Sequence, residues 1–129
     1  MARKIGQGTH WCRPATRLAI YLRDGLACAY CGESVEDGAQ LTLDHLAPNS
    51  RGGSNDPGNL VTCCHRCNSA RGARPVRTFC RAVAEYLDAD AVAIERHVRA
   101  CARRVLPRAE ARTLLSRRGT IAAAIRRQS

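Results

Sequence analysis

Two pairs of cysteines, each with two residues between its members, restrict the fold of this 129-residue chain more than any other feature. They are Cys28 and Cys31, then Cys64 and Cys67, with 32 residues between the pairs. Two turns of this kind can place four thiolates around one tetrahedral zinc ion. Because protein would then fill all four positions, we expect this zinc to be structural and not catalytic.

Other uses of these cysteines are less well supported. A redox dithiol or a pair of disulfides is the alternative, but no thioredoxin-like βαβ pattern surrounds either pair. Cys63 precedes Cys64 at the end of an apolar run. We interpret Cys63 as a small core residue. It remains open at this point whether Cys63 takes the place of Cys64 as a ligand.

The charge is unevenly distributed along what we expect to be one domain. The chain has 21 Lys+Arg against 11 Asp+Glu, a formal charge of +10. Residues 1–27 carry +4, residues 28–74 carry −1 and residues 75–129 carry +7. A near-neutral centre between two basic flanks favours a polyanionic partner that is gripped around a central site.

The N-terminal residues are basic and have no apolar run of signal-peptide length. No window approaches the roughly 18 apolar residues of a membrane span. We therefore expect an intracellular, cytoplasmic protein without a membrane partner, in a compartment where thiols stay reduced.

Between the cysteine pairs, the sequence predicts two short strands joined by a long loop. Residues 40–45 alternate as a strand that ends on Asp44 and His45, and residues 59–62 form the second strand. The loop at 46–58 is rich in Gly, Pro, Asn and Ser. Successive strand residues point to opposite faces, so Asp44 and His45 need not share one task.

Helices are expected on either side of this region. The first is predicted from Pro14 to Leu22, with Gly25 as its C-terminal cap, and a short one follows the second cysteine pair over 68–71. Apolar stripes predict two longer helices after residue 75, the second carrying Ile94, Val98, Cys101 and Val105. Two short helices should complete the chain, around Leu114–Leu115 and from Ile121 to Arg127.

Three segments, "CAYCG", "LTLDHLAPNSRGGSNDPGNLV" and "CHRCNSARG", strongly resemble the zinc-bearing branch of the HNH endonuclease family. The resemblance covers about residues 16–74. It implies an α+β fold, with a ββα-metal (His-Me finger) core stapled by the four-cysteine zinc site. The implied divisions are a basic arm at 1–15, a nuclease domain at 16–74 and a basic helical extension at 75–129.

The resemblance also implies a role for each matched residue. His45 would be the general base that activates water. Asp44 and Asn68 would hold a catalytic divalent ion, and Asn59 would brace the loop and orient the histidine. Cys28, Cys31, Cys64 and Cys67 match the ligands of the structural zinc.

One departure from the family pattern bears on the catalytic metal. Some members carry a further histidine four residues after the last motif position, where this chain has Gly72. The ion would then have two protein ligands, with water and phosphate completing its shell. Such a site favours Mg²⁺ or Mn²⁺ over zinc.

Arg51, Arg71 and Arg74 are the expected nucleic-acid contacts within the matched segment. For Arg71, an exposed helix position without a function is an equally good interpretation. The twelve arginines of residues 75–129 are either a solvated face or a clamp on phosphates. Few aromatic residues are present for stacking on unpaired bases, which favours duplex DNA as the partner.

The leading hypothesis is therefore a metal-dependent endonuclease that nicks or cleaves duplex DNA, with His45 as general base. A zinc-stapled DNA-binding module without catalysis is the alternative, as is an RNA-directed nuclease of the same fold. The sequence leaves the oligomeric state open, including a homodimer. A phage, mobile-element or other bacterial origin is compatible with the resemblance.

Overall fold

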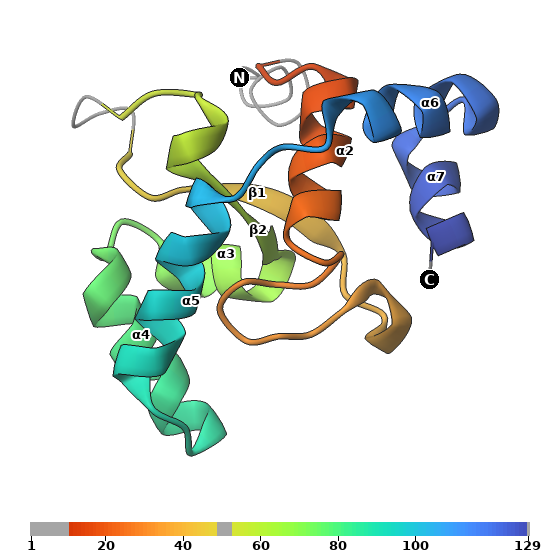
Figure 1. Cartoon of the computed structure of the whole chain (residues 1–129). Helices are drawn as coiled ribbons and strands as arrows, with labels where there is room; N and C mark the ends of the chain where they lie inside the picture. Colours follow the sequence, from red (N-terminus) through yellow and green to blue (C-terminus); the bar gives the residue numbers. More distant parts are fainter. Residues whose placement is uncertain (1–10, 49–52, 129) are drawn as a thin grey trace, which may run out of the picture.

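The computed structural model describes residues 11–48 and 53–128, and it has the expected α+β class. A single antiparallel hairpin lies among helices that come from both ends of the chain (Figure 1). In chain order the elements are α2 (Pro14–Arg23), η1 (Val35–Asp37), β1 (Leu41–His45), η3 (Pro57–Asn59), β2 (Leu60–Cys64), α3 (His65–Arg71), α4 (Val76–Leu87), α5 (Ala91–Arg103), α6 (Arg108–Arg118) and α7 (Ile121–Gln128).

The two strands pair along their full lengths, from Leu41 opposite Cys64 to His45 opposite Leu60. Residues that face each other across the pair share one face of the sheet. His45 therefore lies on the face of Leu60, whereas Asp44 lies on the face of its partner Val61. The pairing thus gives the two polar residues at the end of β1 separate surroundings.

The end of the second strand and the start of the helix after it differ from the sequence prediction. β2 continues to Cys64, two residues past the expected end, and α3 begins at His65, three residues before the expected start. Cys64 is the N-cap of α3, and its sulfur accepts a hydrogen bond from the Cys67 amide at 3.4 Å. The thiolate that ends the strand therefore also starts the helix.

A buried ion pair fastens α2 to the start of β2. Arg23 Nε lies 2.8 Å from Asp24 Oδ1, and both side chains are almost fully buried. The Arg23 guanidinium also donates to the carbonyls of Pro57 at 3.0 Å and Leu60 at 2.7 Å. Asp24 Oδ2 accepts from the Thr62 amide at 2.8 Å. These bonds place α2 against the hairpin and hold the end of the long loop.

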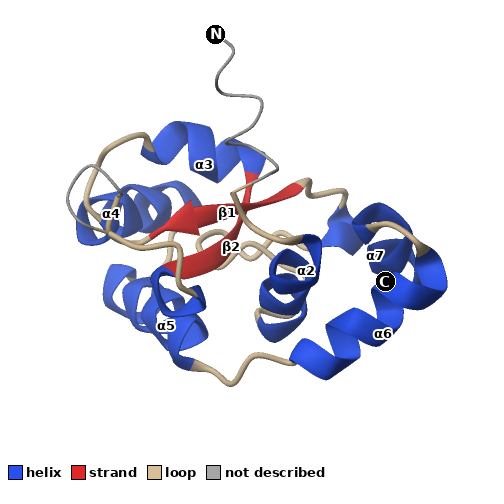
Figure 2. Cartoon of the chain, turned by 90° about the horizontal axis from the view of Figure 1, so that it is seen from above, coloured by secondary structure: helices blue, strands red, loops and turns tan. Residues whose placement is uncertain are grey.

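The remaining helices pack against elements that precede them, as Figures 1 and 2 show. α4 and α5 form a helical hairpin, and Val98 of α5 joins Val61 and Cys63 of β2 in one buried cluster. α6 and α7 pack together, and α6 contacts α2. The predicted division at residue 75 stays a prediction. No helix in the described residues is long and apolar enough to cross a membrane.

One predicted core position is wrong. Val105 was expected to continue the buried stripe of α5, but this helix ends at Arg103 and Val105 is 91 % exposed. Side chains three and four positions apart share a face only while the backbone is helical. Beyond Arg103 the apolar pattern therefore no longer predicts burial.

Candidate metal centre and nuclease site

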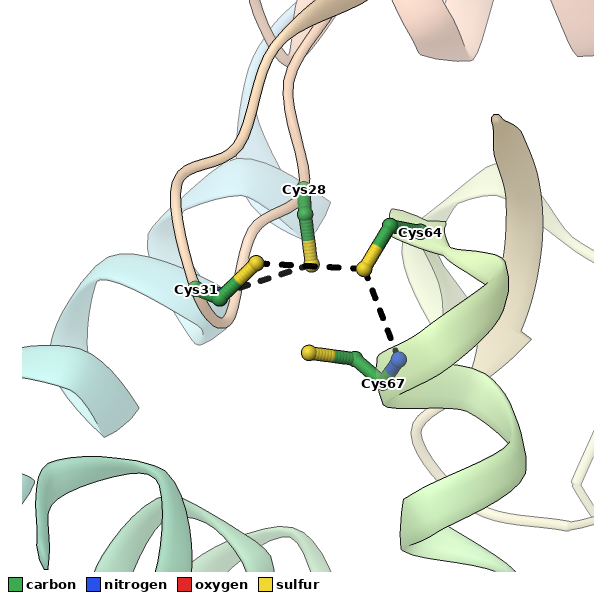
Figure 3. A group of neighbouring side chains, drawn as sticks. All are labelled: Cys28, Cys31, Cys64 and Cys67. Atoms are coloured by element: carbon green, nitrogen blue, oxygen red, sulfur yellow. Dashed lines mark hydrogen bonds between the residues drawn. The ribbon is translucent and has the colours of Figure 1, made fainter. Parts of the chain in front are cut away.

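The four cysteines of the two pairs come together in one cluster (Figure 3). Their sulfur atoms all lie within 4.8 Å of one another, and the Cys31 and Cys64 sulfurs are 3.8 Å apart. A regular tetrahedron with Zn–S bonds of about 2.3 Å has edges of about 3.8 Å. The cluster therefore has the ligand type, number and spacing of a structural zinc site.

Each cysteine pair is shaped by a backbone amide that points at a sulfur. The Cys31 amide donates to Cys28 Sγ at 3.5 Å, as the Cys67 amide does to Cys64 Sγ. Gly32 follows the first turn with a φ of 82°, a conformation that favours glycine. Amide–sulfur bonds stabilise thiolates, the form in which cysteine binds metal.

Cys63 lies outside the four-sulfur cluster. It is fully buried in the core, and its thiol donates to the Cys64 carbonyl at 3.3 Å. Hydrogen bonds from Cys63 and Cys67 lower the pKa of the Cys28 thiol. The same contact with Cys28, together with burial, raises the pKa of Cys63. Cys64 is thus a member of the four-sulfur cluster, and Cys63 is its buried neighbour; the ligand assignment stays a prediction.

Asp44 is buried at the end of β1 and held by two donors. Its Oδ2 accepts from the Tyr30 hydroxyl at 2.7 Å and from Arg71 Nη1 at 2.5 Å. Burial raises the pKa of Asp44, while the Arg71 charge and the Tyr30 hydrogen bond oppose that rise. Both bonds end on the same carboxylate oxygen, Oδ2.

Arg71 has a different environment from the one expected. It is buried, with 4 % exposure, so the interpretation as an exposed helix residue is wrong. Besides Asp44, its guanidinium donates to the carbonyls of His45 at 2.7 Å, Leu46 at 3.0 Å and Arg74 at 2.9 Å. A direct contact with phosphate would require Arg71 to leave these partners. Its observed contacts fix the backbone at the end of β1.

His45 lies on the other face of the strand between two side chains. Its Nε2 is 2.8 Å from Asn55 Oδ1, across the loop that separates the strands. On another side, the ring of Trp11 lies 4.9 Å from the imidazole, centroid to centroid. The Arg17 guanidinium sits over the same indole at 5.5 Å. His45 is half-buried, so part of its ring still meets solvent.

Asn59 bridges the two ends of the long loop. Its Oδ1 accepts from the Ala47 amide at 2.9 Å, and its Nδ2 donates to the carbonyls of Ala47 at 2.9 Å and Ser54 at 2.7 Å. These are main-chain contacts just after His45 and just before Asn55. In the described residues the side-chain hydrogen bonds of Asn59 run to the loop backbone and not to the imidazole.

The other expected site residues lie on or near α3. Asn68 is exposed, one helical turn before Arg71 and therefore on the same side of α3. Arg74 is exposed, and its guanidinium lies over the Phe79 ring at 5.2 Å. Arg51 falls outside the described residues. The roles assigned to all these residues remain predictions.

Four residues in these contacts were not singled out by the sequence analysis: Trp11, Arg23, Tyr30 and Asn55. Tyr30 sits inside the first cysteine turn, where the pattern draws attention to the ligands alone. Asn55 belongs to a polar loop without periodicity. A long loop rich in hydrogen-bonding side chains is a general sign of function, but it does not single out one residue.

Comparisons with known proteins relate the part of the chain that carries this site to the HNH endonuclease family. A model of the HNH endonuclease family matches residues 28–84, which extend from Cys28 into α4. A CRISPR-associated endonuclease Cas9 from Corynebacterium diphtheriae is 39% identical over 54 residues, which are 41% of this chain. The corresponding enzyme from Actinomyces naeslundii is 40% identical over 60 residues, or 46% of this chain.

The chain spans about 5% of the length of each of these two relatives. Among solved structures, the type II-C Cas9 enzyme from Actinomyces naeslundii is similar with 24% sequence identity and a TM-score of 0.46. That likeness covers 80% of this chain and 13% of the Cas9 chain.

Proposed function

We propose that this chain, which belongs to the HNH endonuclease family through residues 28–84, is a metal-dependent endonuclease that hydrolyses DNA phosphodiester bonds. The observation that carries the proposal is the end of β1. There an imidazole and a carboxylate, adjacent in sequence, are held on opposite faces by separate partners. A general base and a metal ligand need this kind of separation, since one must take a proton and the other must stay anionic.

His45 is the general base in this proposal. Its ring is half-exposed and oriented by Asn55 and Trp11, so it can meet a water molecule without losing its alignment. A neutral imidazole near pH 7 can accept the proton that water loses as it attacks phosphorus. Asn59 contributes by fixing the loop on either side of the base.

Asp44 and Asn68 would hold the catalytic ion. The oxygen ligands that they offer suit Mg²⁺ or Mn²⁺. Asp44 Oδ2 is occupied by Tyr30 and Arg71, which leaves Oδ1 for the ion, and Asn68 lies one turn from Arg71. When bound, such an ion supplies positive charge to a phosphoryl oxygen and to the leaving oxygen.

The four-cysteine cluster is a structural zinc site in this proposal. It joins the turn after α2 to the start of α3, and Tyr30 within the first turn reaches Asp44. Zinc would therefore fix the hydroxyl that orients the proposed metal ligand. We also propose the ββα-metal arrangement of β1, β2 and α3 as the core of the nuclease domain.

The proposed substrate is duplex DNA, and the strongest support is charge. Residues 28–74, with a charge of −1, lie between segments of +4 and +7. Contacts of this kind bind phosphates with little sequence preference and weaken as salt rises. Arg74, exposed just after α3, is the described arginine that we propose for such a contact. An intracellular location follows as part of the same proposal.

The decisive experiment incubates supercoiled plasmid with purified protein across a series of Mg²⁺, Mn²⁺ and Zn²⁺ concentrations. We expect nicked or linear product with Mg²⁺ or Mn²⁺, and loss of at least about 100-fold in rate for His45→Ala. His97→Ala, which removes an exposed histidine on α5, is the matched control and should cut normally.

Each contrary outcome has a clear meaning. Salt-sensitive DNA binding without cleavage under any metal would favour the non-catalytic binding module. Digestion of RNA in preference to plasmid would favour the RNA-directed nuclease. Equal cleavage by His45→Ala and the intact protein would overturn the assignment of the base.

A further inference from the structure

His45 contacts two side chains, Trp11 and Asn55, to which the family resemblance assigns no role. Trp11 comes from the segment before α2, outside residues 28–84, and Asn55 comes from the loop between the strands. Together they restrict how the imidazole can turn, because one contact is a hydrogen bond of 2.8 Å and the other is a tilted ring contact at 4.9 Å between centroids. What matters for chemistry is which ring nitrogen each contact leaves free.

We propose that Asn55 is a positioning residue that keeps the proton of neutral His45 on Nε2, so that Nδ1 is the atom that accepts a proton from water. The amide oxygen of asparagine only accepts hydrogen bonds. Since Asn55 Oδ1 lies 2.8 Å from Nε2, that nitrogen must donate. A neutral imidazole carries one N–H, which leaves the lone pair on Nδ1. This inference rests on the proposed function for its chemical meaning.

The resulting step balances. A water molecule gives its proton to Nδ1 and its oxygen forms a bond to phosphorus, while the bond from phosphorus to the leaving oxygen breaks. The leaving oxygen keeps the electron pair of that bond. His45 becomes an imidazolium, whose Nε2–H donates to Asn55 Oδ1 more strongly than before because the donor is now charged. Asn55 therefore stabilises the histidine as it accepts the proton.

Asn55 is itself held in place by the loop. The carbonyl of the preceding residue, Ser54, accepts from Asn59 Nδ2 at 2.7 Å. The carbonyl of Pro57, two residues after Asn55, accepts from buried Arg23 at 3.0 Å. A side chain that is anchored on both sides along the chain can fix the orientation of its neighbour.

Trp11 contributes a packing contact. Its ring is tilted by 34° to the imidazole, and its own face is covered by the Arg17 guanidinium. The indole thus blocks rotation of His45 away from Asn55, while the hydrogen bond decides which nitrogen carries the proton.

The test is the ¹⁵N and ¹H NMR spectrum of the His45 ring in the full chain at pH 8, without catalytic metal. We expect protonated Nε2, unprotonated Nδ1, and an Hε2 signal that exchanges slowly with water. Asn55→Asp keeps an acceptor and should retain that signal. Asn55→Leu removes the acceptor at similar size and should lose it. Ser54→Ala, a change in the same loop whose side chain contacts Asp56, should leave the signal unchanged.

Plasmid cleavage by the same variants gives the second measurement. We expect kcat to fall roughly 10–100-fold in Asn55→Leu and to stay within about 10-fold in Asn55→Asp, as for other residues that orient a catalytic group. A proton on Nδ1 in the intact protein, or an unchanged Hε2 signal and rate in Asn55→Leu, would overturn the inference. The NMR result decides the position of the proton even if no substrate is cut, so failure of the proposed function is distinguishable.

Discussion

At the scale of single residues, adjacent positions in one strand have unrelated surroundings. Asp44 meets Tyr30 and Arg71 in the interior, whereas His45 meets Asn55 and Trp11 near the surface. The cause is the two-residue period of a strand, which sends neighbours to opposite faces. A carboxylate and an imidazole can therefore be adjacent in sequence and still have different hydrogen-bond partners.

Trp11 should report on its contact with His45. It is the single tryptophan of the chain, and its ring centroid lies 4.9 Å from that of the imidazole. His45→Gln removes this ring contact, so we expect its fluorescence emission to differ from that of the intact protein. His97→Ala, at an exposed histidine of α5, is the control and should leave the emission unchanged. An unchanged emission spectrum in His45→Gln would contradict the contact.

Arg71 and Arg74 form a matched pair for separating structure from binding. Arg71→Ala leaves Asp44 buried without its charged partner, which typically costs about 3–5 kcal/mol. Arg74→Ala removes an exposed arginine from an aromatic ring and should cost about 1 kcal/mol or less. Urea unfolding measures the free energies of unfolding, and equal losses in the two variants would contradict the assigned difference in burial.

DNA binding measured at several salt concentrations would show whether Arg74 contacts phosphate.

At the scale of elements, the hairpin is positioned by polar groups as much as by its apolar face. The Arg23–Asp24 pair is nearly inaccessible to solvent, and its further hydrogen bonds to Pro57, Leu60 and Thr62 join α2 to the end of the loop and to β2. Buried charges of this kind are costly unless each one is paired. The position of the loop that carries Asn55 and Asn59 therefore depends on Arg23 at the end of α2.

Asp24→Ala should destabilise the fold strongly, by about 3–5 kcal/mol, because it leaves buried Arg23 without its negative partner and the Thr62 amide without its acceptor. Asp37→Ala is the matched control, since Asp37 caps an exposed turn where water can replace the lost bond. Thermal unfolding of both variants measures the difference. A similar loss of stability in the two proteins would show that the buried pair contributes little.

The α4–α5 packing can be tested through Cys80. Burial raises the pKa of this thiol to about 11, so at pH 8 only about one molecule in a thousand has the reactive thiolate. Alkylation by iodoacetamide should therefore be slow at pH 8 and faster as the pH approaches 11. Mass spectrometry of the Cys80 peptide gives the rate, and urea-unfolded protein provides the reference. Rapid labelling of folded protein at pH 8 would contradict the burial of Cys80.

At the scale of the whole molecule, the four-cysteine cluster brings together two segments that are far apart in the sequence. One cysteine turn follows α2, and the other links β2 to α3. A zinc ion there would fix the frame in which Tyr30 reaches Asp44. Because ligands on separate segments meet only in the folded chain, the free energy of zinc binding adds to that of folding.

We expect one zinc per chain, measured by elemental analysis of purified protein. Cys64→Ser should lose the metal, whereas Cys63→Ser, the adjacent change outside the cluster, should keep it. Removing zinc with a chelator should abolish cooperative unfolding, since structural zinc contributes about 10–16 kcal/mol and whole domains have about 5–15 kcal/mol of stability. Zinc retained by Cys64→Ser, or lost from Cys63→Ser, would reverse the ligand assignment.

The sequence by itself determined the elements and the inventory of reactive groups. Helix caps, apolar periodicity and turn residues predicted the helices and the two strands, and the spacing of the cysteine pairs predicted the cluster that the structure brings together. These signals are local, because each depends on residues a few positions apart. The same reasoning led to an incorrect position for Val105, where the periodic pattern continued past the end of the helix.

Only the tertiary structure decided the partners of those reactive groups. That Arg71 is buried against Asp44, that Asn55 and Trp11 hold His45, and that Cys64 enters the cluster while Cys63 does not are outcomes of how distant segments pack. The register of β1 on β2 assigns each side chain to a face, and the docking of α2 and α3 brings its partner within reach. Contacts of this kind depend on distance in space, which the local pattern of a sequence does not contain.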